Sequence, residues 1–571
     1  MSRVHSISIK NFRGIKDFHG EFNTDLVCLI GRGDSGKSTV LEALALALSA
    51  NWNVSFFDND FHNCDTGNPI LIEVTLIDVP GELLAETKFG MHLKAYDASQ
   101  HRVYDEPEMA DGIAITIQLS VEKDLEPKWH VVTNREAGNR FIGAADRSKF
   151  NAFLVSDFMD RHFSWGKGSP LYSLLRQELR INEEEDVLID ILRAAKGKID
   201  VSSFSKFDSV ISKVKSSAQS FGIDISKSLT TIDFKDFLFK DGKLSLHDES
   251  IPFRLKGKGS KRLISMTIQA LIAGTGGLVL IDEIEQGLEP DRVQNLINIL
   301  TKHNKGQVFI TTHSRDVLVE VTSEKLYLIR KEEKSPYRFP SSMQGVCRKN
   351  PEAFFAKKII VAEGATEIGI CRALQDFRLA NEKANMAYLG VRVADGSGSE
   401  MIEYVKHFKA AKFPVCLFCD SDAENKDKKK DFAKRKAALR TDNVPIFDWD
   451  QGDNLETAII KALPFEAIRS LYGIAVAYKV EENGSTTDKV NQSFVAAIKH
   501  MFPACPDDFY QAVDAPALRT AVAGAAVRQK WFKSQEKGKA LGKVIFDHFD
   551  QLKDGTLKKQ LTALNNWIDA Q

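Results

Sequence analysis

The sequence lacks the hydrophobic runs that membrane insertion or secretion requires. No stretch of about 18 consecutive apolar residues occurs in the 571 residues. The first ten residues, MSRVHSISIK, alternate like a strand and have no long apolar core of the kind found in secretory signals. Only seven cysteines are present, an odd number scattered through strand and helix patterns, which is typical of a reducing compartment. We therefore expect a cytoplasmic protein with no membrane partner.

An excess of one charge sign is also missing. The chain has 77 Lys and Arg against 78 Asp and Glu, for a formal net charge of -1. A neutral chain has no global attraction to nucleic acid, so any such partner must be held by local basic patches. Two basic runs occur, KDKKKDFAKRK at 426–436 and RQKWFKSQEKGKALGK at 528–543. Each run taken alone is more typical of a solvated helix face.

The length predicts more than one hydrophobic core, because domains rarely exceed about 250 residues. We place a domain boundary near residue 345, giving an N-terminal domain at 1–345 and a C-terminal domain at 346–571. Between 148 and 228 the pattern changes to charge-rich helical periodicity, as in EEEDVLIDILRAAK at 183–196. This pattern predicts a helical insertion in the first domain.

The first phosphate-binding pattern is the glycine-rich run GRGDSGKS at 31–38. It follows a predicted strand at 26–30 and leads into a predicted helix at 38–49, the context of a nucleotide-binding P-loop. Glycines there let backbone N–H groups surround phosphate oxygens at a helix N-terminus. We expect Lys37 to reach the β- and γ-phosphates of ATP and Ser38 to bind Mg2+. The predicted cofactor-binding residues are Gly31, Gly33, Asp34, Ser35, Gly36, Lys37, Ser38 and Thr39.

A second part of this site is predicted where the apolar strand LVLI at 278–281 ends. Asp282 is suited to hold the Mg2+ water shell, and Glu283 to polarise the attacking water. The alternative interpretation is that these acidic residues only mark the point where a buried strand leaves the core and reaches the surface. The following runs EQGLEPD and VFITTHS favour the catalytic interpretation. His313, predicted at the tip of the next strand, is then a switch residue that reaches the γ-phosphate.

Together with NFRG at 11–14, these motifs resemble the ABC-type ATPases of the structural-maintenance and DNA-repair group. The resemblance implies that Arg13 belongs to the ATP site. LKGKGSKRL at 255–263 occupies the place of the family's signature motif but departs from the usual Leu-Ser-Gly-Gly-Gln. Which of its residues contact ATP, and whether two protomers sandwich the nucleotide, stays open. FFDNDF at 56–61 is a candidate for the Q-loop.

A second kind of phosphate chemistry is predicted in the C-terminal domain. The strand KKIIVA delivers Glu363, with Glu367 in the first turn of the next helix, and the strand PVCLFC delivers Asp420, with Asp422 two residues further. The C-terminal ends of parallel strands share one edge of a sheet, so these carboxylates should meet there. They would repel one another unless cations balanced them, and Mg2+ and Mn2+ prefer such oxygen ligands. We expect two ions that cleave a phosphodiester.

Additional ligands are available in DWDQGDNLE at 448–456, which follows a predicted strand at 444–447. We favour Glu456 as a metal ligand. Solvated loop charges are the more typical interpretation of Asp448, Asp450 and Asp453.

The pattern of strand, Glu-Gly-x-Thr-Glu, strand and Asp-x-Asp resembles the Toprim fold of topoisomerases, bacterial primases and several nucleases. The glycine loop DGSGS at 395–399 fits this resemblance. Behind an ABC-type ATPase, it makes the whole chain similar to the OLD (overcoming lysogenisation defect) family of ATPase–Toprim endonucleases in anti-phage defence. The implied fold class is α/β: an ABC-type P-loop ATPase domain with a helical insertion, then a Toprim domain with a Rossmann-like parallel sheet.

The family resemblance has further implications. A lysine late in the Toprim domain should neutralise charge in the transition state; Lys537, Lys539 and Lys543 compete for this role, and we favour Lys543. Residues 148–228 become a dimerisation element of a homodimer that cuts DNA. A second defence component is also implied, either a helicase or a reverse transcriptase with its noncoding RNA.

Two other functions compete with an ATP-regulated DNA endonuclease. A DNA-repair or chromosome-organising ATPase could bind DNA without cutting it, but four clustered carboxylates are a costly accumulation of charge for a scaffold. A topoisomerase needs a tyrosine nucleophile, and none of the ten tyrosines lies in a recognisable DNA-binding helical module. We therefore predict an ATPase that controls a Mg2+- or Mn2+-dependent Toprim nuclease.

Overall fold

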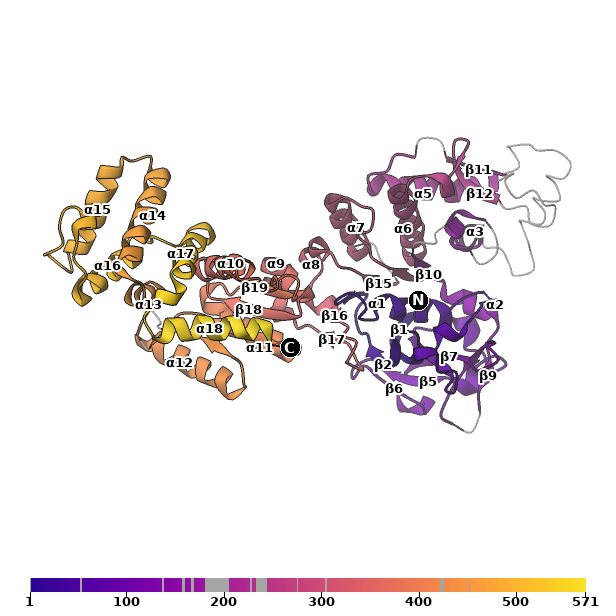
Figure 1. The fold of residues 1–571 in the computed structure, drawn as a ribbon. Coiled ribbons are helices and arrows are strands. Elements are labelled where there is room, and N and C mark those ends of the chain that lie inside the picture. Colours follow the sequence, from indigo (N-terminus) through magenta and orange to yellow (C-terminus); the bar gives the residue numbers. More distant parts are fainter. Residues whose placement is uncertain are drawn as a thin grey trace. The chain divides into compact units, whose positions relative to one another are not determined.

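The computed structural model describes the chain except residues 1, 52–53, 136–137, 157–159, 166–168, 180–204, 226–227, 233–243, 275, 303–305, 422–425, 451 and 571. The chain divides into two compact units, Met1–Gln344 and Gly345–Gln571 (Figure 1). Each unit is built around its own parallel sheet. No described helix is long and apolar enough to cross a bilayer.

The first unit begins with an antiparallel sheet in the order β2-β1-β4-β7-β5-β6, with β8 paired to β7 and β9 to β8. Buried and partly exposed side chains alternate along β4, as expected of a sheet that covers a core with one face. The strands are β1 (Arg3–Phe12), β2 (Ile15–Glu21), β4 (Ile70–Ile77), β5 (Lys94–Asp97), β6 (Arg102–Tyr104), β7 (Gly112–Val121), β8 (Pro127–Val131) and β9 (Arg140–Phe141).

The second sheet of this unit is parallel in the order β10-β14-β15-β3-β16, with the short β17 antiparallel at the edge. Its central strands are fully buried, which explains their continuous apolar sequences. Helix α1 (Lys37–Ala47) shares one core with strands of both sheets. The strands are β3 (Leu26–Ile30), β10 (Ala152–Val155), β14 (Leu278–Ile281), β15 (Gln307–Thr311), β16 (Leu326–Leu328) and β17 (Tyr337–Arg338).

The predicted helical insertion at 148–228 is only partly helical. It contains α3 (Pro170–Leu179) and α5 (Asp208–Ser220), but β10 lies inside it and pairs with β14. The prediction was wrong for β10, because a four-residue apolar run has no periodicity that distinguishes a buried strand from a helix. The helix expected at 183–196 lies within residues that the structure does not describe.

Helix α6 packs against α3, α5 and β14. A small antiparallel sheet, β11-β12-β13, precedes it in the sequence. Further elements of the first unit are α2 (Ala144–Arg147), β11 (Ser228–Ile232), β12 (Leu244–Asp248), β13 (Ile251–Pro252), α6 (Lys258–Gly274), α7 (Pro290–Lys302) and α8 (Arg315–Glu320).

The second unit has a parallel sheet in the order β19-β18-β20-β21. Each strand is followed by a helix, the alternation that builds parallel sheets. The elements are β18 (Lys358–Ala362), α10 (Ala365–Ala380), β19 (Val391–Asp395), α11 (Met401–Ala410), β20 (Val415–Phe418), α12 (Lys426–Thr441), β21 (Ile446–Phe447) and α13 (Leu455–Ala462); α9 (Gln344–Lys349) precedes them.

The rest of this unit is helical (Figure 1). Its helices share an apolar core with the sheet. Helix α17 lies directly on α10, because glycines remove the side chains that would separate them. A Cβ on Gly369 of α10 would lie 2.5 Å from the backbone of Gly538 in α17. The helices are α14 (Phe465–Asn483), α15 (Thr487–Lys499), α16 (Pro516–Arg528), α17 (Gln535–Asp547) and α18 (Thr556–Asp569).

Candidate nucleotide site and carboxylate cluster

The glycine-rich loop connects β3 to α1 and has backbone conformations that require glycine. Gly31 has φ +148°, and a Cβ there would lie 2.4 Å from the carbonyl oxygen of Ile329. Gly36, the N-cap of α1, has φ +98°. Glycine is therefore required at both positions for the loop to fold into the start of α1, where backbone N–H groups can bind phosphate.

Lys37 is buried and turned into its own loop. Its Nζ donates hydrogen bonds to the carbonyl oxygens of Gly31 at 3.1 Å and Arg32 at 2.8 Å. Burial lowers the pKa of Lys37 to about 8, although the charges of Asp282 and Glu283 oppose this shift. A polyphosphate could replace these carbonyl partners and hold the ammonium fully charged.

The P-loop and the end of β14 meet through Asp282. Its Oδ1 accepts hydrogen bonds from Ser38 Oγ at 2.9 Å and Thr311 Oγ1 at 2.6 Å. Ser38 and Asp282 are the two side chains expected to hold Mg2+, and they lie within one hydrogen bond of each other. Glu283 follows with φ +47°, and its backbone N–H donates to Thr311 Oγ1 at 2.7 Å.

His313 lies just after the end of β15, the strand that pairs with β14. Its backbone N–H donates to Glu285 Oε1 at 2.6 Å, and Thr312 Oγ1 donates to the other oxygen of this carboxylate. Partial burial and then the charge of Lys37 lower the pKa of the His313 imidazole. A neutral imidazole keeps one ring N–H, which can donate to a phosphate oxygen.

The remaining predicted nucleotide-site residues occupy two different environments. Gly33 and Asp34 are exposed at the tip of the loop, whereas Ser35 and Thr39 are half-buried. Arg13 donates to Asp60 Oδ1 at 2.9 Å and also pairs with Glu42 of α1. Arg13 thus joins FFDNDF, the Q-loop candidate, to the P-loop helix.

In the second unit, the ends of β18 and β20 bring carboxylates together. Glu363 follows β18, and its Oε2 accepts a hydrogen bond from the backbone N–H of Asp420 at 2.8 Å. Glu367, in the first turn of α10, is 5% exposed and accepts from Gly364 N at 3.0 Å. Asp420 Oδ1 accepts from Trp449 Nε1 at 3.0 Å and Leu455 N at 2.8 Å.

Glu456 completes this carboxylate cluster, which we define as Glu363, Glu367, Asp420 and Glu456. It lies in the first turn of α13 and is 2% exposed, yet its Oε1 has no hydrogen-bond partner. Burial and then the charges of Glu363, Glu367 and Glu456 raise the pKa of Asp420 to about 8. Burial and then Glu363 raise the pKa of Glu367 to about 7. The cluster is therefore electrostatically incomplete without a cation.

The lysine that faces this cluster is Lys533, which the sequence interpretation did not include. Its Nζ lies 3.7 Å from Glu456 Oε1. Burial opposes the charged form, but Glu456, Glu367, Asp420 and Glu363 together raise the pKa of Lys533. Thr366 Oγ1 donates to the carbonyl oxygen of Phe532 at 2.9 Å and so fixes the adjacent backbone beside α10.

None of the three predicted lysines has a described contact with the carboxylate cluster. Lys537 pairs with Glu482, and Lys539 pairs with Asp376 at 2.8 Å. Lys543, the favoured candidate, is exposed on α17. Helix α17 turns Gly538 and Gly542 towards α10, and the loop before the helix delivers Lys533. The spacing of Gly538 and Gly542 marks the face of α17 that packs on α10, but no local sequence signal identifies Lys533.

The residues present fit a divalent cation by their chemistry. The donors are carboxylate oxygens, one of them buried without a hydrogen-bond partner, at the sheet edge where α/β proteins bind ligands. In the present side-chain arrangement, no three His, Cys, Asp or Glu side chains among the described residues enclose an ion position. Asp422, a predicted ligand, lies outside the described residues.

Three other acidic residues near the cluster have basic or hydroxyl partners instead. Asp448 pairs with Lys436 and Arg440, both at 2.7 Å, and Asp453 pairs with Lys461 at 2.7 Å. Asp450 accepts from Thr556 Oγ1 at 2.5 Å. These interactions leave Glu456 as the acidic residue of this segment that faces the cluster.

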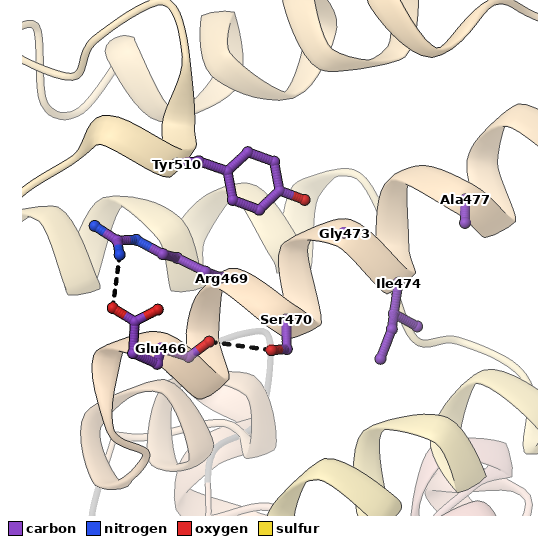
Figure 2. A pocket seen from close by; sticks show the side chains of 7 residues that line it. All are labelled: Glu466, Arg469, Ser470, Gly473, Ile474, Ala477 and Tyr510. Carbon is purple, nitrogen blue, oxygen red and sulfur yellow. Dashed lines mark hydrogen bonds and ion pairs between the residues drawn. The ribbon is translucent and has the colours of Figure 1, made fainter.

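A groove of about 570 Å³ on α14 contains none of the cluster residues (Figure 2). Tyr510 lies across the groove, and Glu466 is paired with Arg469. Its one lining carboxylate is therefore neutralised by an arginine and lies outside the carboxylate cluster.

Comparison with known proteins matches both halves of the chain. An AAA ATPase domain model matches residues 3–102, and a second AAA domain model matches 241–320. The model described as overcoming lysogenization defect protein-like, TOPRIM domain, matches residues 354–422.

Several curated proteins are similar to this chain. An "ATP/GTP phosphatase" of Helicobacter pylori is 24% identical over 352 residues, which cover 56% of this chain and 89% of that protein. The "Retron Ec83 probable ATPase" of Escherichia coli is 25% identical over 409 residues, 60% of this chain and 74% of that protein. The DNA replication and repair protein RecF of Rickettsia akari is 25% identical over 159 residues, 28% of this chain and 40% of that protein.

Among solved structures, the recombination mediator RecF bound to ATP matches at 13% identity and a TM-score of 0.36, covering 59% of this chain and 99% of that one. The domain models carry the assignment. The chain has an AAA ATPase domain followed by an OLD-like Toprim domain, and it thereby matches the ATPase–Toprim arrangement of the OLD family.

Proposed function

We propose that this protein is a cytoplasmic, ATP-hydrolysing and metal-dependent DNA endonuclease of anti-phage defence, in which the ATPase controls a two-metal Toprim nuclease. The observation that carries this proposal is the carboxylate cluster, in which Glu367 and Glu456 are buried and Lys533 lies beside Glu456, in a chain that also has a P-loop. A scaffold gains nothing from gathering four mutually repelling carboxylates, two of them buried, whereas a metal-dependent nuclease needs such oxygen ligands.

In the ATPase unit, Lys37 and the loop backbone bind the phosphates of ATP. Ser38 and Asp282, already joined by a hydrogen bond, hold the Mg2+ that accompanies the nucleotide. Glu283 polarises the attacking water, and His313 contacts the γ-phosphate.

In the Toprim unit, Glu363, Glu367, Asp420 and Glu456 hold the cations, with Asp422 as a further proposed ligand. Two Mg2+ or Mn2+ ions, when bound, supply an activated water and stabilise the leaving oxygen. Lys533 keeps its proton in the field of the carboxylates and neutralises negative charge on the phosphate in the transition state.

The test compares wild type, Glu363→Ala and Asp420→Ala on supercoiled and linear DNA, in Mg2+, Mn2+ and EDTA. Asp376→Ala is the matched control, because Asp376 is an exposed carboxylate paired only on the surface with Lys539. We expect wild type and the control to cut with metal and the two cluster variants to be silent, with ATP turnover kept by all. Equal cutting by wild type and both cluster variants contradicts the metal site.

Protection of cells against phage provides a second readout for the same variants. The retron relative motivates the proposal that a reverse transcriptase with its noncoding RNA, or else a helicase, works with this protein. A wild type that binds DNA and hydrolyses ATP, but neither cuts DNA nor protects cells, supports the alternative of a repair-type ATPase.

A further inference from the structure

The start of α6 is fastened to the acidic loop after β14 by one buried guanidinium. Arg262 is 3% exposed, and its Nη2 donates to the carbonyl oxygens of Asp282 and, at 2.8 Å, Glu283. Its Nη1 donates to Gln286 Oε1 at 2.6 Å. These three acceptors span the loop that contains the proposed catalytic carboxylate.

Backbone packing reinforces this contact. Gly259, one turn before Arg262, lies so close to the same loop that a Cβ there would be 2.7 Å from the carbonyl oxygen of Gly287. The segment at 255–263, which occupies the place of the signature motif, therefore contacts the acidic loop of its own chain.

Glu283 needs such support because its backbone is strained. Its φ of +47° lies in the left-handed region, which residues other than glycine adopt only when their surroundings impose it. Thr311 Oγ1 accepts from the N–H of Glu283, and Arg262 donates to its carbonyl oxygen. The residue is thus held from both sides, which fixes the direction of its side chain.

We propose that Arg262 is a positioning residue for ATP hydrolysis, holding Glu283 where its carboxylate can orient the attacking water. The inference rests on the proposed role of Glu283. Arginine stays charged at any working pH, so its contribution is geometric. The Asp282 carboxylate is fixed separately by Ser38 and Thr311, so nucleotide and Mg2+ binding should not depend on Arg262.

The test uses the full-length protein with Arg262→Lys and Arg262→Gln. A lysine keeps the charge but cannot reach three acceptors with a planar fork. We expect phosphate release to fall about tenfold to a hundredfold, while the Kd for ATP changes less than about threefold. The control is Arg338→Gln, because Arg338 is an exposed arginine that donates to the carbonyl oxygen of Glu324.

A double-mutant cycle separates positioning from general structural support. If Arg262 acts through Glu283, then Arg262→Lys added to Glu283→Gln lowers the residual turnover no further. Additive losses, unchanged turnover in both Arg262 variants, or a Kd that weakens in parallel with turnover overturn the inference. If the wild-type protein binds ATP but releases no phosphate, the proposed ATPase function is wrong as well. This outcome is measured on the wild type before any variant is made.

Discussion

Lys533 contributes the positive charge that the carboxylate cluster faces. Replacing it with alanine should lower DNA cleavage by about a hundredfold, because a preorganised charge at the reacting phosphate is lost. Lys543→Ala should cut like wild type, since Lys543 is exposed on α17. Initial rates on one DNA substrate at saturating Mn2+ measure both. If Lys543→Ala instead cuts more slowly than Lys533→Ala, then Lys543 is the lysine that neutralises the transition state.

The sequence reveals the acidic residues better than their basic partner. Glu363 and Asp420 follow short apolar runs, and such runs indicate buried parallel strands whose ends share an edge. Lys533 lies in WFKS, a segment without periodicity between two helices. Its position depends on how closely α17 approaches α10, which is a tertiary property that local sequence does not encode.

Lys37 makes ATP binding sensitive to pH. Burial lowers its pKa from the ordinary 10.5 to about 8 in the nucleotide-free protein, and bound phosphates should raise it again. Above about pH 8, binding must therefore take up a proton, so affinity falls with rising pH, by at most about tenfold per unit. Below about pH 7 this group contributes no pH dependence.

Calorimetry at pH 7, 8 and 9, in buffers of different ionisation enthalpy, measures both the affinity and the proton uptake. Lys37→Arg is the informative variant, because arginine stays charged over this range. An affinity that is constant from pH 7 to 9 without proton uptake contradicts the prediction.

At the scale of elements, the contact between α10 and α17 depends on glycine. A Cβ on Gly538 would lie 2.5 Å from the carbonyl oxygen of Thr366, which is backbone and cannot move aside cheaply. We expect Gly538→Ala to destabilise the Toprim unit by about 1–3 kcal/mol and to displace the loop that carries Lys533. Cleavage should fall while ATP turnover is kept.

Thermal unfolding and the two activity assays test this prediction together. Gly345→Ala is the matched control, since a Cβ there meets only Tyr404 Oη at an ordinary 3.9 Å. Wild-type cleavage and unchanged unfolding in Gly538→Ala would show that the helices separate without cost.

Several elements agree closely with their sequence patterns, and the failures have physical causes. β3 and β14 have the predicted bounds, because four or five consecutive apolar residues between polar loops fix where each buried strand begins and ends. The segment that forms β10 was predicted as part of a helical insertion, because its partner strand β14 is more than 100 residues away in the sequence. Long-range pairing of this kind cannot be inferred from local periodicity.

At the scale of the whole molecule, each unit has its own proposed site, and the resemblance to ABC-type ATPases implies that a second copy completes the ATP site. Leu255, at the start of the segment in the signature position, is 61% exposed. Because this segment occupies the place of the signature motif, a second protomer would cover it, and Leu255 is a suitable position at which to test that contact.

We therefore expect Glu283→Gln, which should bind ATP without hydrolysing it, to form a homodimer when ATP is added. Light scattering at micromolar protein measures the mass with and without nucleotide. Adding Leu255→Glu should restore the monomer, because a charge would be buried without a partner. Tyr388→Glu is the control, since Tyr388 is 83% exposed in the Toprim unit. A strict monomer in every condition means that one chain hydrolyses ATP alone, and the Leu255 surface then serves another purpose.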